Sequence, residues 1–206
     1  MAVNPLPHDL LWGCRAEHLP ADAPDWAAQA MLHGQPVVVR RAQLADGLVA
    51  IGIRGVGREQ RYAAQMPLAA VTRRVSPESL IERDSVHDWP AIRALRQLRP
   101  MLNASGLTWG VSGSAGFELA SGVAALHAGS DLDLIVRAPV ALDKYAARQL
   151  LGLIDQAECQ VDLQLQTPCG AVALREWAGA AGKVLLKSSS AAVLVRDPWN
   201  PQELAA

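Results

Sequence analysis

The clearest alternation of apolar and polar residues lies in the second half of the chain. Residues 130–136 place three apolar side chains on one face of an expected strand and Asp131 and Asp133 on the other, because successive side chains of a strand point to opposite faces. Residues 160–166 alternate in the same way and carry Asp162 on their polar face. The pattern therefore predicts two strands with acidic side chains on one side.

Shorter apolar runs and helical spacing predict the remaining elements. Strands are expected at residues 36–41, 48–54, 58–64, 107–111, 184–187 and 192–195. Helices are expected at 25–32, from Ser76, at 91–99, from near Ala115, at 139–153 and at 171–180. We therefore expect an α+β fold, with a small, mainly β lobe over residues 1–76 and an α/β domain with a mixed sheet over residues 77–206.

The acidic side chains of the two strands suggest a metal site. Asp131 and Asp133 would have Cα atoms roughly 6.5 Å apart, and carboxylates so close repel each other unless a cation lies between them. Oxygen ligands suit Mg²⁺ or Mn²⁺, which complete their shell with waters and substrate phosphates. With Asp162 as a third ligand, two such ions can activate an attacking oxygen and stabilise a leaving one. The alternative is a solvated strand face, and it weighs most for Asp162.

A Gly-Ser pair precedes the first acidic strand. Gly113 and Ser114 follow an apolar strand and come before a predicted helix. Backbone N–H groups at such a turn, together with the Ser114 hydroxyl, form a cradle for phosphate oxygens. Dipeptides of this kind mark many turns, so the pair gains its meaning from the carboxylates that follow it.

Composition and charge narrow the classes of function. The chain has 206 residues, half of them hydrophobic, and a net charge of −1, which argues against broad electrostatic binding to nucleic acid. No apolar run is long enough for a membrane helix, and the first residues do not resemble a signal peptide. The odd number of cysteines favours reduced thiols. We therefore expect a soluble, cytoplasmic protein.

Arginines gather in the first half of the chain. Between residues 40 and 74 they outnumber the acidic residues Asp46 and Glu59, and they are Arg40, Arg41, Arg54, Arg58, Arg61, Arg73 and Arg74. Guanidinium groups suit phosphate, so Arg54, Arg58 and Arg61 are candidate contacts for a phosphate-bearing substrate or for an acidic protein. Lys187 is a further candidate for phosphate. A solvated surface is the alternative for all of them.

The order of these motifs carries a resemblance. A Gly-Ser pair, then Asp-x-Asp on a strand, then Asp on a later strand resembles the nucleotidyltransferase superfamily of the DNA polymerase β type. Further stretches are similar to the malonate decarboxylase holo-acyl-carrier-protein synthase family, also called phosphoribosyl-dephospho-coenzyme A transferase. These stretches are residues 8–12, 38–41, 52–55, 58–61, 109–114, 130–134, 161–164, 182–187 and 198–199.

The resemblance implies a nucleotidyltransferase-like catalytic domain and a specific reaction. The enzyme would take triphosphoribosyl-dephospho-coenzyme A, join it to a serine of the apo acyl-carrier subunit of malonate decarboxylase, and release diphosphate. Asp131 and Asp133 would hold Mg²⁺ across the triphosphate, Gly113 and Ser114 would cradle its outer phosphates, and Asp162 would help activate the serine hydroxyl. Two alternatives are a nucleotidyltransferase using ATP or CTP on another acceptor, and a non-catalytic nucleotide-binding regulatory module.

Overall fold

The computed structural model describes residues 4–57 and 59–201. The chain divides into two compact units, the first with residues 1–76 and 117–125, the second with residues 77–116 and 126–206. The sequence predicted two domains that are each continuous along the chain, with residues 117–125 in the second. In the structure these residues belong to the first unit. Each unit has its own sheet, and helices accompany both, so the expected α+β class is confirmed.

The first unit is built on a five-stranded antiparallel sheet in the order β4-β3-β2-β1-β5. Its strands are β1 (Leu10–Trp12), β2 (Val37–Val39), β3 (Leu48–Arg54), β4 (Arg61–Pro67) and β5 (Arg73–Val75). Helix α1 (Asp25–Leu32) packs on β3, and the short 3₁₀ helices are η1 (Ala16–His18) and η2 (Leu68–Ala70).

Alternation along β3 builds the core of this unit. Val49, Ile51 and Ile53 point to one face and are buried in a cluster with Ala27 and Met31 of α1. Burying a side chain the size of isoleucine stabilises the folded state by roughly 1.5–3 kcal/mol, before the entropy of ordering the chain is counted. The amphipathic helix therefore has an apolar sheet face to cover.

The second unit is built on a six-stranded sheet in the order β11-β10-β9-β8-β7-β6. Its strands are β6 (Thr108–Val111), β7 (Leu132–Arg137), β8 (Val161–Thr167), β9 (Gly170–Ala173), β10 (Val184–Lys187) and β11 (Ala192–Val195). Its helices are η3 (Pro77–Leu80), α2 (Pro90–Ala104), α4 (Lys144–Ile154) and α5 (Leu174–Ala178). Helix α3 (Gly113–Ser121) begins in this unit.

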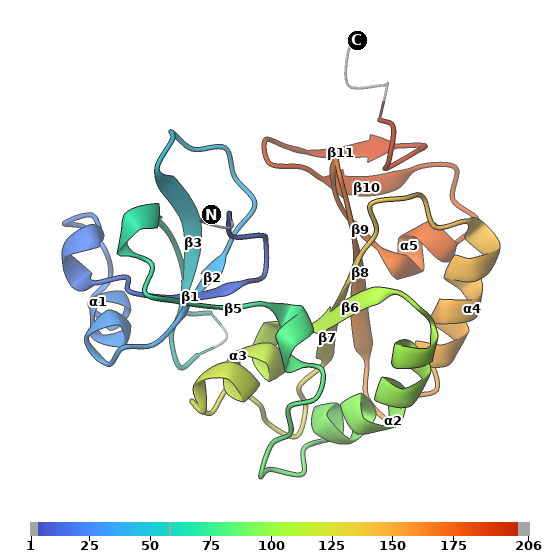
Figure 1. The fold of residues 1–206 in the computed structure, drawn as a ribbon, viewed down its shortest axis with the longest axis horizontal. Coiled ribbons are helices and arrows are strands. Elements are labelled where there is room, and N and C mark those ends of the chain that lie inside the picture. The colour runs from blue at the N-terminus through green and yellow to red at the C-terminus, as the bar shows by residue number, and fades with distance from the viewer. Residues whose placement is uncertain (1–3, 58, 202–206) are drawn as a thin grey trace. The chain divides into compact units, whose positions relative to one another are not determined.

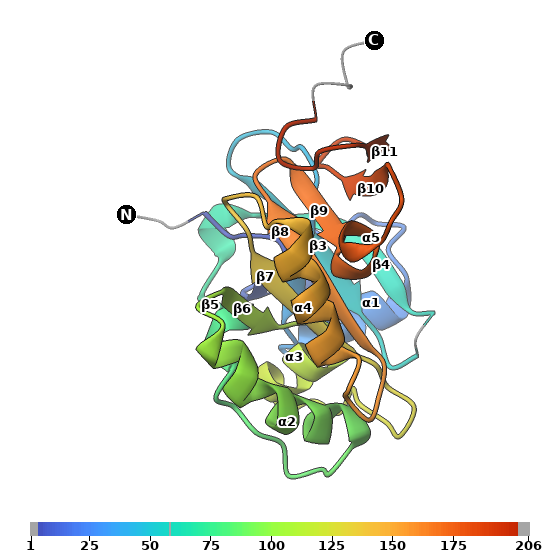
Figure 2. The ribbon, with the colours of Figure 1, turned by 90° about the vertical axis from the view of Figure 1, so that its right-hand side faces the viewer.

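The sheet of the second unit is mixed. β7 and β8 pair in parallel, and the other neighbours pair antiparallel. The parallel pair is connected through α4, as a crossover between parallel strands requires. Figures 1 and 2 show α2, α4 and α5 on one face of this sheet.

The two faces of this sheet differ in polarity. Leu132, Leu134 and Val136 of β7 are fully or almost fully buried, and so are Leu95 and Leu98 of α2, the helix that packs on this strand. The residues between those three on β7 point to the opposite face, which includes the acidic positions. The helices therefore cover the apolar face, and the predicted site residue Asp133 lies on the opposite face.

Several predicted elements agree with the structure. Strands at residues 48–54, 184–187 and 192–195 and the helix at 25–32 are found with the expected bounds. The strands at 36–41, 107–111, 130–136 and 160–166 and the helix at 91–99 are present with shifted ends. None of the helices in the described part of the chain has the length and apolar character needed to cross a membrane.

Other expectations were wrong in detail. The helix expected from Pro139 begins at Lys144, because Asp143 caps it by accepting hydrogen bonds from the first turn. Residues 171–173, expected in a helix, belong to β9, since pairing with β8 outweighs the helix preference of alanine. The helix expected from Ser76 is only the 3₁₀ turn η3, and the strand expected at 58–64 is displaced to β4.

Candidate active site

Parallel pairing places Asp133 of β7 beside Asp162 of β8. The two residues are register partners, so their Cα atoms lie about 4.8 Å apart and their side chains leave the same face of the sheet. Asp131 lies one residue before β7, where the Leu132 N–H donates to the Gln160 carbonyl at 2.9 Å. The expected carboxylates therefore gather where the two parallel strands begin.

The Gly-Ser bend lies against this group. Gly113 has a φ of +58°, in the left-handed region that favours glycine. A Cβ atom added there would collide with Oδ2 of Asp133. The Ser112 N–H also donates to the Asp133 carbonyl at 2.9 Å, which joins the bend to β7. The structure thus brings Gly113 into direct contact with one of the predicted carboxylates.

Helix α3 begins at this bend, two residues earlier than expected. The Gly116 N–H donates to the Ser112 carbonyl and closes the first turn, at 2.8 Å. The N–H groups that precede it, those of Gly113, Ser114 and Ala115, have no acceptor within the helix, and the helix dipole adds partial positive charge at this end. Ser114 is partly exposed. An anion bound here would face the partial positive charge of the helix end. A cation bound to that anion would face the carboxylates.

Asp162 has a neighbour that the sequence pattern did not single out. The Gln160 side-chain amide donates to both Asp162 oxygens, at 3.2 and 3.3 Å. Gln160 and Asp162 are two residues apart in an alternating stretch of the sequence, and this spacing was the signal that could have revealed the contact. The amide orients the carboxylate, which is exposed, without neutralising its charge.

Cys159 lies close to the acidic group, and its surroundings favour the protonated thiol. Burial raises the pKa of its thiol above the ordinary value, and the carboxylates of Glu158 and Asp131 raise that pKa further. A hydrogen bond with the Leu132 backbone lowers the pKa, and its influence is second only to that of burial. The thiol therefore stays protonated at neutral pH.

The carboxylates suit a metal ion only if waters or substrate phosphates supply the remaining ligands. Within residues 4–57 and 59–201, no three His, Cys, Asp or Glu side chains form a group that could hold a metal ion by themselves. Mg²⁺ commonly takes one or two carboxylates and completes its shell with waters and substrate phosphates. The Asp133–Asp162 pair, with Asp131 beside it, suits that mode, and metal binding by these residues stays a prediction.

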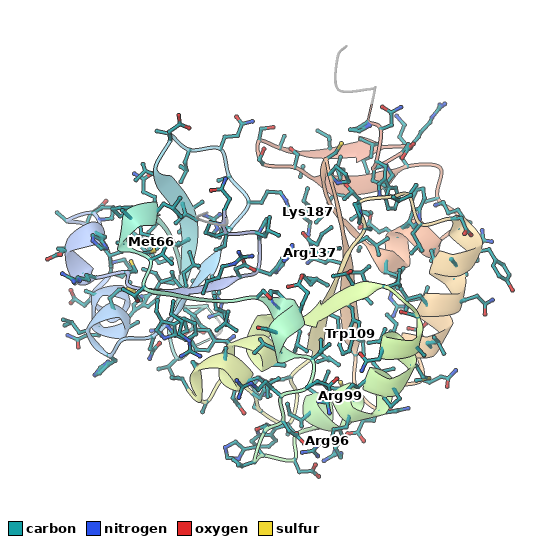
Figure 3. The ribbon with its side chains drawn as sticks, viewed as in Figure 1. Met66, Arg96, Arg99, Trp109, Arg137 and Lys187 are labelled. Carbon is teal, nitrogen blue, oxygen red and sulfur yellow. The ribbon has the colours of Figure 1, made fainter. Side chains whose placement is uncertain are left out.

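Lys187 shares the polar face but lies at its other end. Arg137, Gln166, Ala171 and Lys187 are successive cross-strand neighbours and form one row across the sheet. The row lies four residues beyond Asp133 on β7, about 13 Å along the strand. Figure 3 shows Arg137 and Lys187 on the side of the sheet away from α4 and α5. A substrate contact of Lys187 stays a prediction, at a distance from the carboxylates.

Arg137 is a charged residue of the polar face that the sequence pattern did not single out. Its Nε donates to Oε1 of Glu78 at 2.6 Å, and 16% and 25% of the two side chains remain exposed. Arg137 lies four residues after Asp133 on the same strand, so the alternation that selected the aspartates also selects it. The ion pair fixes η3 against β7.

The candidate arginines belong to the first unit or lie outside the described residues. Nη2 of Arg54 donates to the Ala125 carbonyl at 3.1 Å. Nη1 of Arg61, which is exposed, donates to the carbonyls of Gly57 and Gln60 at 3.1 and 2.9 Å. Arg58 is not among the described residues. Both described arginines hold backbone segments, and their contact with substrate stays a prediction.

Comparison with known proteins extends this picture to the whole chain. Residues 6–77 match a family model described as the phosphoribosyl-dephospho-CoA transferase MdcG N-terminal domain, and residues 79–198 match the corresponding C-terminal domain. A protein of Pseudomonas fluorescens strain Pf0-1 is 60% identical over 206 residues, which is the full length of both chains.

Two further relatives agree. A protein of Pseudomonas fluorescens strain Pf-5 is 62% identical over 98% of this chain and 97% of its own, and one of Pseudomonas aeruginosa is 55% identical over 99% and 98%. All three relatives are named phosphoribosyl-dephospho-CoA transferase. No solved structure matches the chain.

A glycine bend lies beside paired carboxylates on a mixed sheet, and the relatives are named transferases, which defines the class: the protein is a transferase. The family models that match the two halves of the chain and the names of the relatives describe one kind of transferase. The chain belongs to the phosphoribosyl-dephospho-CoA transferase family.

Proposed function

We propose that this transferase moves the 2'-(5''-phosphoribosyl)-3'-dephospho-CoA group from its triphosphate precursor to a serine of the apo acyl-carrier subunit of malonate decarboxylase. The observation that supports the proposal best is the register of Asp133 with Asp162 beside the Gly113 bend. The names of the relatives supply the transferred group. We also place the reaction in the cytoplasm, where the acceptor would be made.

The reaction exchanges one phosphorus–oxygen bond for another. The serine oxygen of the carrier attacks the α-phosphorus of the triphosphate, the bond from that phosphorus to the bridging oxygen breaks, and diphosphate leaves with the electron pair. The serine proton goes to Asp162, whose orientation Gln160 maintains. Transfer of this kind depends on alignment and charge neutralisation more than on covalent help from the protein.

The other groups at the bend bind and align the substrate. N–H groups at the start of α3 and the Ser114 hydroxyl bind the outer phosphates. Asp131 and Asp133 are the residues that would hold Mg²⁺ or Mn²⁺, which neutralises triphosphate charge when bound. Contact between Gly113 and Asp133 keeps the anion-binding bend and the carboxylate at a constant spacing.

Mass spectrometry of the carrier subunit tests this proposal. Purified enzyme, apo carrier and triphosphoribosyl-dephospho-CoA should give a carrier with the mass of the added group when Mg²⁺ is present, and none when the metal is chelated. Asp133→Asn should abolish the gain, while Asp46→Asn, the same change at an exposed position of the first unit, should not. Normal transfer by a folded Asp133→Asn variant would refute the proposed role of Asp133.

Two further arms separate the alternatives. Labelled ATP and CTP in place of the triphosphoribosyl substrate would label an acceptor if the enzyme were an ordinary nucleotidyltransferase. Absence of Mg²⁺-dependent diphosphate release with every donor would instead leave a non-catalytic binding protein.

A further inference from the structure

A cavity in the first unit lies outside the machinery described above. Its volume is about 280 Å³, and aromatic and amide side chains line it, among them Trp26, Phe117, Gln29, Gln35 and Gln60. Small-ligand sites are mostly apolar with a few placed polar groups, and this composition matches that description. The volume is large enough for a bicyclic base and too small for a complete coenzyme.

One wall of the cavity is a fixed stack. The guanidinium carbon of Arg54 lies 5.5 Å from the centroid of the Phe117 ring, while the same group is hydrogen-bonded to the Ala125 carbonyl at 3.1 Å. Phe117 is 2% exposed. A cation held over an aromatic face extends a flat, polarisable surface, which is the kind of surface that stacks on a heteroaromatic ring.

The amides keep hydrogen-bonding capacity. Oε1 of Gln60 accepts from the Gly57 N–H at 3.2 Å, which leaves its NH₂ group to donate elsewhere. Within the part of the chain that the structure describes, the side-chain amides of Gln29 and Gln35 have no hydrogen-bond partner. Each amide carries both donors and an acceptor, so the cavity presents both kinds of group beside its aromatic walls.

We propose that this cavity binds a purine base, and specifically the adenine of the 3'-dephospho-CoA part of the substrate. The assignment rests on the proposed function for the source of the base. A purine offers two flat faces for the aromatic walls and an edge with both donors and acceptors for the amides. An aliphatic chain would leave the amides without partners, and a phosphate group would leave the aromatic walls unused.

The cavity and the bend share a helix. Phe117 belongs to α3, whose first residue is Gly113, and it follows Gly113 by about one turn.

Calorimetric titration of the full-length protein with 3'-dephospho-CoA, AMP and 4'-phosphopantetheine tests the assignment. The two ligands that carry adenine should bind, and 4'-phosphopantetheine should bind far more weakly. Gln35→Leu, which removes one amide at nearly constant volume, should weaken both adenine ligands about fivefold to tenfold. Ala124→Trp, which fills the exposed mouth, should weaken them about tenfold or more.

Gln65→Leu is the matched control, because Gln65 is exposed on β4 and does not line the cavity. It should leave binding unchanged. The proposal is overturned if Gln35→Leu and Ala124→Trp bind adenine ligands as the unchanged protein does, or if 4'-phosphopantetheine binds as tightly as 3'-dephospho-CoA. The second result would assign the cavity to the pantetheine arm or to an apolar side chain of a partner.

Two readouts keep this proposal apart from the function on which it rests. Asp133→Asn should lose transfer and keep adenine binding, whereas the cavity variants should raise KM for the donor and leave kcat near its starting value. Adenine binding without any transfer would refute the proposed function and keep the cavity assignment. Transfer with an unchanged KM in both cavity variants would keep the proposed function and refute the cavity assignment.

Discussion

Replacement of Gly113 by alanine tests whether the bend positions the carboxylate. Two separate costs arise at this position. A side chain at a φ of +58° costs about 1 kcal/mol relative to glycine. The added Cβ also meets the Asp133 carboxylate, which must move aside by about 1 Å or more, and a shift of that size in a catalytic group can lower a rate about 10²-fold.

Gly106→Ala separates the two costs. Gly106 also has a positive φ, +72°, but nothing lies within 4 Å of a Cβ atom built there. Gly106→Ala should lose about 1 kcal/mol of unfolding free energy in urea, since it places a side chain in the left-handed region. Gly113→Ala should lose more, because its Cβ also meets the side chain of Asp133. Only Gly113→Ala should lose transfer, by about 10²-fold when the rate is followed by the mass of the carrier.

The comparison has a clear negative outcome. If the two variants are equally destabilised and transfer at similar rates, the contact between the bend and Asp133 has no part in catalysis. Loss of transfer in both would instead mean that strain alone disturbs the site.

Three further predictions concern stability. Asp143→Ala should lower the unfolding free energy by about 1 kcal/mol in urea, because Asp143 accepts hydrogen bonds from the Tyr145 and Ala146 N–H groups at the start of α4; an unchanged midpoint would contradict its role as a cap. Burial raises the pKa of the Cys14 thiol from 9.0 to about 11, so the folded state keeps a proton that the unfolded chain releases. The unfolding free energy should therefore hold below pH 9 and fall as pH rises from 9 to about 11, and Cys14→Ala should remove that part of the pH dependence. Arg137→Met should destabilise the protein by about 2 kcal/mol and cost less when Glu78→Gln is also present, because the single change removes the Arg137 charge from beside a mostly buried carboxylate; additive losses in the double variant would argue against coupling.

The acidic end of the site could be predicted because it depends on local patterns. Alternation along residues 130–136 and 160–166 places the aspartates on the polar side of each strand, whatever the strands pair with. Apolar runs likewise gave β3, β10 and β11 with their observed bounds. Patterns that a segment carries within itself survive folding when the packing agrees with them.

The remainder depends on contacts between distant segments. The collision that keeps a side chain off Gly113 requires β7 to lie beside the bend, and the Arg137–Glu78 ion pair joins residues far apart in sequence. The start of α4 was misplaced because Asp143 offers a stronger cap than the Pro139 signal. The parallel register of Asp133 with Asp162 could not be derived, since alternation fixes the face and not the partner.

The parallel pairing of β7 with β8 has a consequence for which changes in length the family can tolerate. Extra residues in the connections around α4 would leave the Asp133–Asp162 pair intact, because the loops can absorb them. One residue inserted within β8, before Asp162, would turn that carboxylate toward the helices and bring an apolar side chain into its place. Among related chains, gaps should therefore collect outside these two strands, and those that fall inside them should mark proteins that have lost the reaction.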